Sequence, residues 1–335
     1  MTNPLLVEIT RGQMVESMHR GAICVVDGDG STVLSIGDVS EPVFPRSAVK
    51  AIQALPLIES GAADAFGFGD REIALSCASH SGQAEHAALA SSMLASAGLD
   101  ESALECGWHW PMWQDAAHDL ARQGKVPNQL HNNCSGKHSG FICTCRHLGI
   151  DHAGYVGAEH ASQRMIRDAM IEVTGAAHDD ANSGIDGCSI PTYAIPLRSL
   201  ALGFARMASG TTFSANRAAA ARRILAANMA EPFFVAGTDR LDTRLMRAGQ
   251  GRIMVKTGAE GVYCGAVPEL GLGIALKCDD GGTRASEVMV LAVLAHLFRH
   301  DEAMVERLAA LSKRPVNTRK GVAAGEERFV GGFGG

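Results

Sequence analysis

Strand-like segments stand at both ends of this 335-residue chain, with a long helical stretch between them. Near the N-terminus, residues 5–9 and 22–36 have strand character, and the turn Asp27-Gly28-Asp29-Gly30 would close the second segment into a hairpin. Strand character returns near the other end, at residues 252–256, 261–267 and 271–278. Strands so far apart along the chain share a sheet only when the chain folds back on itself, which limits the possible folds.

The stretch between these strands has helical periodicity. It predicts a helix that begins near residue 47 and further helices at 83–97, 137–148, 158–174, 197–208 and 214–229. Two more are predicted after the last strands, at 284–299 and near 301–312. The economical packing is an α/β (α+β) fold with an antiparallel sheet built from about 1–40 and 250–280, covered by helices, and a helical region of about 50–245 inserted. We find no Pro- or Ser-rich linker and expect a single domain over 1–335.

Composition excludes several classes of protein. The formal net charge is −6 with no long run of one sign, so a nucleic-acid-binding face is not expected. No run of about 18 apolar residues indicates a membrane span, and the short apolar stretch at the N-terminus is interrupted by Glu8, unlike a secretion signal. Nine scattered cysteines predict reduced thiols in the cytoplasm rather than a disulfide scaffold.

Ser47-Ala48-Val49-Lys50 is the first candidate for catalysis. On a helix, the spacing i, i+3 places Ser47 and Lys50 on one face. A serine hydroxyl becomes a nucleophile when a base takes its proton, and a lysine is such a base only when neutral. The alternative is an N-capping serine beside a solvated lysine. Lys256-Thr257-Gly258, on a predicted strand, favours catalysis, because serine β-lactamases and penicillin-binding proteins combine S-x-x-K with a later K-T-G.

A second serine lies in Cys77-Ala78-Ser79-His80-Ser81-Gly82, between the strand-like residues 73–76 and a predicted helix. Small polar residues before a helix usually cap it, and Ser81 fits that role. The functional interpretation makes Ser79 another active-site hydroxyl, which would pair with Lys256 and pass a proton to the leaving amine.

Cysteines and a lysine form a candidate metal site. Cys134 and Lys137 repeat the i, i+3 spacing at the start of a predicted helix, and Cys188 lies in a distant segment. A cysteine at a helix N-terminus has a depressed pKa, and thiolates suit Zn²⁺. The alternative is that these cysteines are simply buried. A phosphate-binding loop is excluded, because His138 follows Gly136-Lys137 where Ser or Thr is needed.

Together these segments resemble the asparaginase II family of the Rhizobium etli type. The similarity spans nearly the whole chain, and the block around Cys134 is its most specific element. The matching stretches are residues 45–50, 76–81, 132–138, 186–192, 255–263 and 314–318.

The resemblance implies a fold like that of serine β-lactamases and glutaminases. It implies hydrolysis of L-asparagine to L-aspartate and ammonia through a serine acyl-enzyme, with two Ser–Lys tandems carried here by Ser47 with Lys50 and by Ser79 with Lys256. We expect neutral Lys50 to take the proton of Ser47, which attacks the amide carbon.

The resemblance also implies ligands and partners. A zinc ion is associated with members of the family, and its ligands map onto Cys134, Lys137 and Cys188, with water completing the shell. A homodimer is expected. The candidate contacts to the substrate's ammonium and carboxylate are Asp186 and Arg46, with Asn133 and His138 as further substrate-binding candidates.

Three other functions compete with this one. A glutaminase would act on a substrate longer by one methylene, which a pocket discriminates by only about 10- to 200-fold. A β-lactamase or D-Ala peptidase would be periplasmic and carry a signal peptide, for which there is no sign. A non-catalytic zinc-binding module would need the Cys and Lys ligands but not the four Ser and Lys residues together.

Overall fold

The computed structural model describes residues 2–333 and contains an eight-stranded antiparallel sheet. The strand order is β11-β12-β1-β2-β10-β9-β8, and β3 also pairs with β2. The bounds are β1 Leu5–Arg11, β2 Met14–Asp27, β3 Thr32–Ile36, β8 Met254–Thr257, β9 Val262–Val267, β10 Leu272–Cys278, β11 Pro315–Asn317 and β12 Ala323–Phe329. The predicted antiparallel sheet from both chain ends is therefore confirmed.

Strand β2 joins the two parts of this sheet. Its first half pairs with β1, while its second half, from Gly21 to Asp27, pairs with β10, and residues 23–26 also pair with β3. The predicted β2–β3 hairpin is present, but β2 begins at Met14, eight residues before the predicted start at residue 22. Much of the added part is exposed, so its side chains lack the apolar run that marks the buried half.

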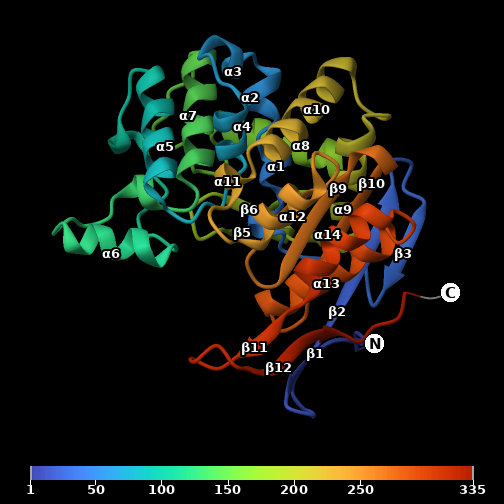
Figure 1. The fold of residues 1–335 in the computed structure, drawn as a ribbon. Helices are drawn as coiled ribbons and strands as arrows, with labels where there is room; N and C mark the ends of the chain where they lie inside the picture. Colours follow the sequence, from blue (N-terminus) through green and yellow to red (C-terminus); the bar gives the residue numbers. More distant parts are fainter. Residues whose placement is uncertain (1, 334–335) are drawn as a thin grey trace.

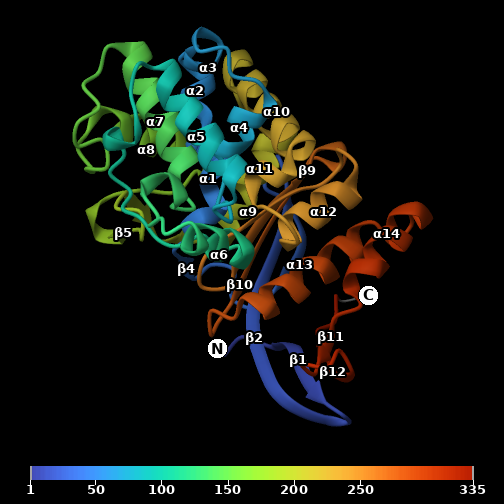
Figure 2. The ribbon, with the colours of Figure 1, turned by 60° about the vertical axis from the view of Figure 1, so that its left-hand side comes forward.

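The sheet extends beyond the predicted ranges 1–40 and 250–280, because β11 and β12 add to its far edge. Strand β12 pairs with β1, for example Val7 with Phe329, and β11 pairs with β12. Charged and small residues dominate these strands, and none of their side chains is fully buried, so the sequence lacks a strand signal there. With β1 they form an arm at the end of the molecule away from the inserted helices (Figures 1 and 2).

Helices fill the insertion and cover the sheet (Figures 1 and 2). The bounds are α1 Lys50–Gln53, α2 Leu55–Glu59, α3 Ala62–Ala65, α4 Asp70–Ser76, α5 Ala84–Ser96, α6 Gln114–Arg122, α7 Ser135–Leu148, α8 Ala161–Thr174, α9 Leu197–Ser209, α10 Ala215–Ala230, α11 Pro232–Val235, α12 Leu241–Gly249, α13 Thr283–Leu297 and α14 Glu302–Ser312. Two further two-stranded antiparallel sheets are present: β4 Pro42–Val43 pairs with β7 Ile195–Pro196, and β5 Ser183–Ile185 pairs with β6 Pro191–Tyr193. In the part of the chain that is described, no helix has the length and apolarity needed to cross a bilayer.

One predicted strand is a helix. Residues 73–76 belong to α4, because the Glu72 side chain accepts a hydrogen bond from the Gly69 N–H at 2.9 Å and so stabilises a helix start. The apolar run that suggested a strand is instead the buried face of α4, which packs against α7 and α10. Short apolar runs fit a buried helix as well as a strand.

Helix α9 packs on β2, β9 and β10, and α13 packs on β9, β10 and β12. The close approach of α9 depends on Gly273 in β10, because a Cβ there would overlap the backbone of Ala201 and Ala205. We expect Gly273→Ala to lower the free energy of unfolding by at least about 3 kcal/mol, measured by denaturant unfolding. Gly69→Ala is the control: its Cβ would lie 3.6 Å from the Glu72 carboxylate, and a comparable loss there would contradict the steric explanation.

Candidate active site

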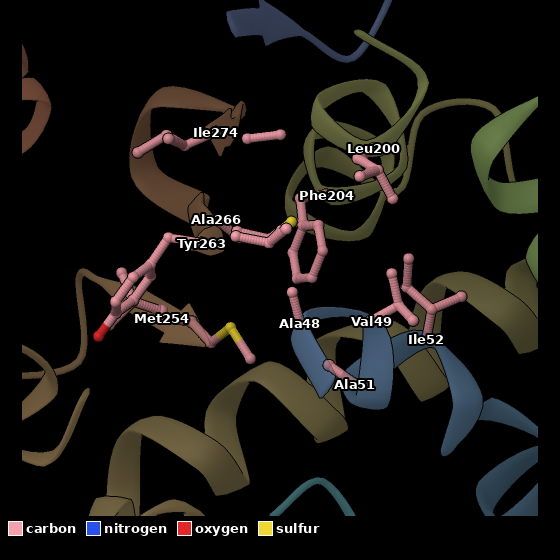
Figure 3. Close-up of a cluster of buried hydrophobic side chains, with 14 of the residues drawn as sticks. Ala48, Val49, Ala51, Ile52, Leu200, Phe204, Met254, Tyr263, Ala266 and Ile274 are labelled. Carbon is pink, nitrogen blue, oxygen red and sulfur yellow. The ribbon is translucent and has the colours of Figure 1, made fainter. Parts of the chain in front are cut away.

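The turn that carries Ser47 is fixed by apolar packing beneath it. A 3₁₀ turn, Arg46–Val49, leads into α1 and packs against β8 and β9. Ala48 and Val49 are buried in the core cluster with Phe204 of α9 (Figure 3). Burial of these two side chains determines which way the turn faces and leaves Ser47 on the wall of a cavity of about 450 Å³.

Two buried lysine amines contact one serine. Lys50 Nζ lies 2.9 Å from Ser79 Oγ, and Lys256 Nζ, on β8, lies 3.0 Å from the same oxygen. Both lysines are fully buried, and Ser79 lines the cavity with Ser47. The structure therefore brings Ser79 and Lys256 together, as expected, and adds Lys50 to that pair.

The first expected tandem has a different geometry. Lys50 Nζ donates to Ala78 O at 2.5 Å, to Ser79 Oγ at 2.9 Å and to Cys134 Sγ at 3.0 Å. These three acceptors match the three N–H donors of a lysine ammonium. Within residues 2–333, the hydroxyl of Ser47 has no hydrogen-bond partner, so Ser47 and Lys50 share a turn without a direct bond. The i, i+3 spacing predicted their neighbourhood but not the path of the long lysine side chain.

The amine of Lys256 is held in a state suited to proton transfer. Burial lowers its pKa from the usual value to about 7, and the positive charges of Lys50 and Arg240 act in the same direction. The carboxylate of Asp242 opposes that shift. Near neutral pH, the neutral and charged forms of Lys256 are therefore both populated.

Asp242 on α12 is a positioning residue that sequence reasoning missed. Its buried carboxylate accepts the Thr257 N–H at 2.6 Å and the Tyr263 hydroxyl at 2.9 Å. These bonds join α12 to the strand that carries Lys256. No motif marks Asp242, because α12 was not predicted as a helix and the contact spans 15 residues.

The three predicted metal ligands also meet. Lys137 Nζ, on α7, lies 3.1 Å from Cys188 Sγ, and the thiols of Cys134 and Cys188 are close enough to shift each other's pKa. The Cys188 thiol lowers the pKa of Cys134 far below its usual value, helped by the nearby Lys50 and Lys137 amines, and the Cys134 thiol raises the pKa of Cys188. Two thiol sulfurs and one amine suit Zn²⁺, so this donor set fits the metal. The neighbouring thiol groups and Asp186 raise the pKa of Lys137, so a metal must displace its proton.

The four predicted substrate contacts separate into two groups. Asn133 lines the cavity with the two serines. Arg46, whose φ is +51°, instead pairs its Nε with Asp186 Oδ1 at 2.9 Å, and this pair is not part of that wall. His138 is fully buried, with Nδ1 2.6 Å from the Tyr155 hydroxyl.

Arg240 was not singled out from the sequence, and it lines the cavity beside Thr238 and Thr257. It lies immediately before α12, at the backbone position that caps this helix. An isolated arginine in a loop has no spacing pattern, so only the folded chain reveals it.

A second cluster lies at the end of β10. His19 Nδ1 is 2.6 Å from Asp280 Oδ2, and the Cys278 thiol donates to Asp280 Oδ1 at 2.9 Å. These hydrogen bonds hold the turn between β10 and α13 against β2, and burial raises the pKa of Cys278 to about 12. These hydrogen bonds explain why the three side chains lie together, and they give the cluster a structural role.

Comparisons with known proteins give one matching family and several solved structures of low sequence identity. A β-lactamase from Mycobacterium bovis is 12% identical with a TM-score of 0.44, covering 84% of this chain and 94% of that one. The structure titled Mglu is 15% identical with a TM-score of 0.38, covering 84% of this chain and 67% of that one. No curated protein matched the chain. The family model described as L-asparaginase II matches residues 7–329, so the chain belongs to the asparaginase II family of amide hydrolases.

Proposed function

We propose that the protein hydrolyses the side-chain amide of L-asparagine to L-aspartate and ammonia through a serine acyl-enzyme. The observation that carries this proposal is the Ser79 oxygen between two buried lysine amines, on the wall of a cavity that also holds Ser47. Family membership supports an amide as the substrate. A covalent serine mechanism needs a hydroxyl and a base in hydrogen-bond reach, and this cluster supplies two hydroxyls and two amines.

Ser47 is the proposed nucleophile, because its hydroxyl lies on the cavity wall and is not engaged elsewhere in the described chain. Its oxygen attacks the amide carbon, and its proton passes to Ser79, whose own proton passes to Lys256. The pKa of Lys256, lowered to about 7 by burial, suits this base role better than Lys50, whose three donors already have acceptors.

The later steps reverse the same path. Lys256 returns the proton through Ser79 to the departing ammonia, and water then cleaves the ester with the same groups removing its proton. Backbone N–H groups, of Ser47 and of a residue that follows Lys256, would hold the oxyanion, each worth about 3 kcal/mol. Substrate binding must bring Ser47 Oγ to Ser79, because catalytic hydrogen bonds often tighten only in the complex.

Ser79 is a second candidate for the nucleophile. Its oxygen has the direct lysine contacts that activate a hydroxyl, at 2.9 and 3.0 Å. It is, however, only 5% exposed, which restricts the approach of a substrate.

Cys134, Lys137 and Cys188 are the residues that would hold zinc. When bound, the ion would supply a positive charge that polarises or positions the substrate amide. Even without the metal, Cys134 is linked to one of the serines, because its Sγ accepts a hydrogen bond from Lys50 Nζ and the same amine contacts Ser79 Oγ. The homodimer and the cytoplasmic location stay predictions.

An ammonia-release assay tests the reaction. With L-asparagine, L-glutamine and nitrocefin as substrates, we expect the highest kcat/KM for asparagine, by about 10- to 200-fold over glutamine, and no colour from nitrocefin. A chelator arm measures the contribution of zinc. A higher kcat/KM for glutamine would make the protein a glutaminase, and no turnover of either amide would favour a non-catalytic zinc-binding module.

A further inference from the structure

Arg240 lines the serine cavity as a cation without a counterion. Among residues 2–333, no carboxylate oxygen lies within 4.0 Å of its guanidinium. Its Nη1 is buried and has no hydrogen-bond partner there. An unsatisfied buried donor costs free energy and calls for an explanation.

Several other partly buried arginines of the described chain are paired with carboxylates, and the two that are not, Arg206 and Arg307, do not line the serine cavity. Arg217 Nε lies 2.7 Å from Glu59, and Arg314 contacts both Glu287 and Glu327 at 2.6 Å. Arg46, the earlier candidate for binding a carboxylate, is already neutralised by Asp186 at 2.9 Å. Arg240 differs from all of these because its unpaired guanidinium belongs to a residue that lines the serine cavity.

The positions around Arg240 favour an anion on the cavity side. Arg240 is close enough to Lys256 to lower the pKa of that amine, although the carboxylate of Asp242 opposes this shift, and the charge of Arg240 also opposes the burial that raises the pKa of Glu287. Thr238 and Thr257 line the same wall and offer hydroxyls beside the guanidinium. Asp239 also lines the cavity, but it is an exposed neighbour and forms no ion pair with Arg240.

We propose that Arg240 is the anion subsite of this cavity and binds the α-carboxylate of the amino-acid amide. This inference rests on the proposed function and names the feature by which the cavity selects its substrate. A guanidinium matches a carboxylate with two parallel N–H donors, which fixes orientation as well as charge. The amide at the other end of the substrate then faces Ser47 and Ser79.

The test compares L-asparagine with its methyl ester, which lacks the negative charge, and measures ammonia release. In the unmodified protein, kcat/KM should be about 10- to 150-fold lower for the ester, the value of a charge-assisted hydrogen bond. Arg240→Met should lower kcat/KM for asparagine by a similar factor and change the ester by less than about threefold, because the two losses report one contact. Arg240→Lys should restore part of the loss.

Arg244→Met is the matched control, because Arg244 is an exposed arginine on α12, the helix that begins directly after Arg240, and the kcat/KM values for both substrates should stay unchanged. Equal losses for acid and ester in Arg240→Met, or no preference for the acid in the unmodified protein, would overturn the assignment. Calorimetric binding of the same two compounds to Ser47→Ala separates this inference from the reaction. Carboxylate-dependent binding that needs Arg240, without ammonia release by the unmodified protein, would reject the reaction and support the subsite.

Discussion

Replacing Ser47 with alanine is expected to lower kcat by about 10⁴- to 10⁶-fold, the scale of losing a covalent nucleophile. The free energy of unfolding should stay within about 0.5 kcal/mol, because the described chain gives this hydroxyl no hydrogen bond to lose. Ammonia release and denaturant unfolding measure the two quantities. Retained turnover would show that Ser47 does not form the covalent bond.

Ser79→Ala gives the contrasting result. It should also abolish turnover, but it removes the acceptor for two buried amines, Lys50 and Lys256. Each buried donor left without its acceptor costs about 1–3 kcal/mol, so this variant should be less stable. Acid quench and tryptic digestion locate the acyl group, because residues 47–50 and 72–122 fall in different peptides. An adduct on the longer peptide would make Ser79 the nucleophile.

Lys256→Met is expected to lower kcat by about 10²- to 10⁴-fold, the usual range for a general base. In the unmodified protein, kcat/KM should rise tenfold per pH unit below about pH 7 and level off above it, because burial lowers the pKa of Lys256 to about 7. The methionine variant should lose this dependence. The measurement is kcat/KM against pH for the unmodified protein and for Lys256→Met. Lys277→Met, which removes a half-buried lysine of β10, is the control and should keep the pH dependence. A profile that is unchanged in Lys256→Met would reject Lys256 as the base.

The same variant should unfold differently with pH. The pKa of Lys256 is about 7 in the folded chain and about 10.4 in an unfolded one, so the unfolded state binds more protons between these values. The stability of the unmodified protein therefore rises with pH through this group. Lys256→Met no longer has a charge to bury. The free energy of unfolding of this variant, minus that of the unmodified protein, should therefore be largest at or below pH 7 and should decline toward pH 10.

Periodicity predicted the main architecture because the buried strands and helices repeat their apolar residues regularly. Strands β8, β9 and β10 are almost entirely buried and read clearly as apolar runs. Strands β11 and β12 could not be recognised, because they lie at the edge and are half-exposed. The pairing of β12 with β1, and of β11 with β12, depends on the sheet that already exists, not on the residues of these two strands.

The site was predictable to the extent that motifs fix neighbourhoods. Ser79 meets Lys256, and Lys137 meets Cys188, across 177 and 51 residues of the chain. The direction of Lys50 toward Ser79 could not be predicted, because a four-carbon side chain reaches past its own turn. Arg240 could not be predicted either, since what distinguishes it is a place on the cavity wall combined with a buried Nη1 that has no partner among the residues that the structure describes.

The pairing of β1 with β12 has a consequence for synthesis in the cell. Residue 7 meets residue 329, so β1 leaves the ribosome long before its partner β12 has been made. The helical insertion can collapse earlier through contacts that are closer along the chain, whereas such distant strand pairing is intrinsically slow. During that interval the edge of β1 stays open, and a nascent chain that still lacks β12 should be prone to aggregate through this edge.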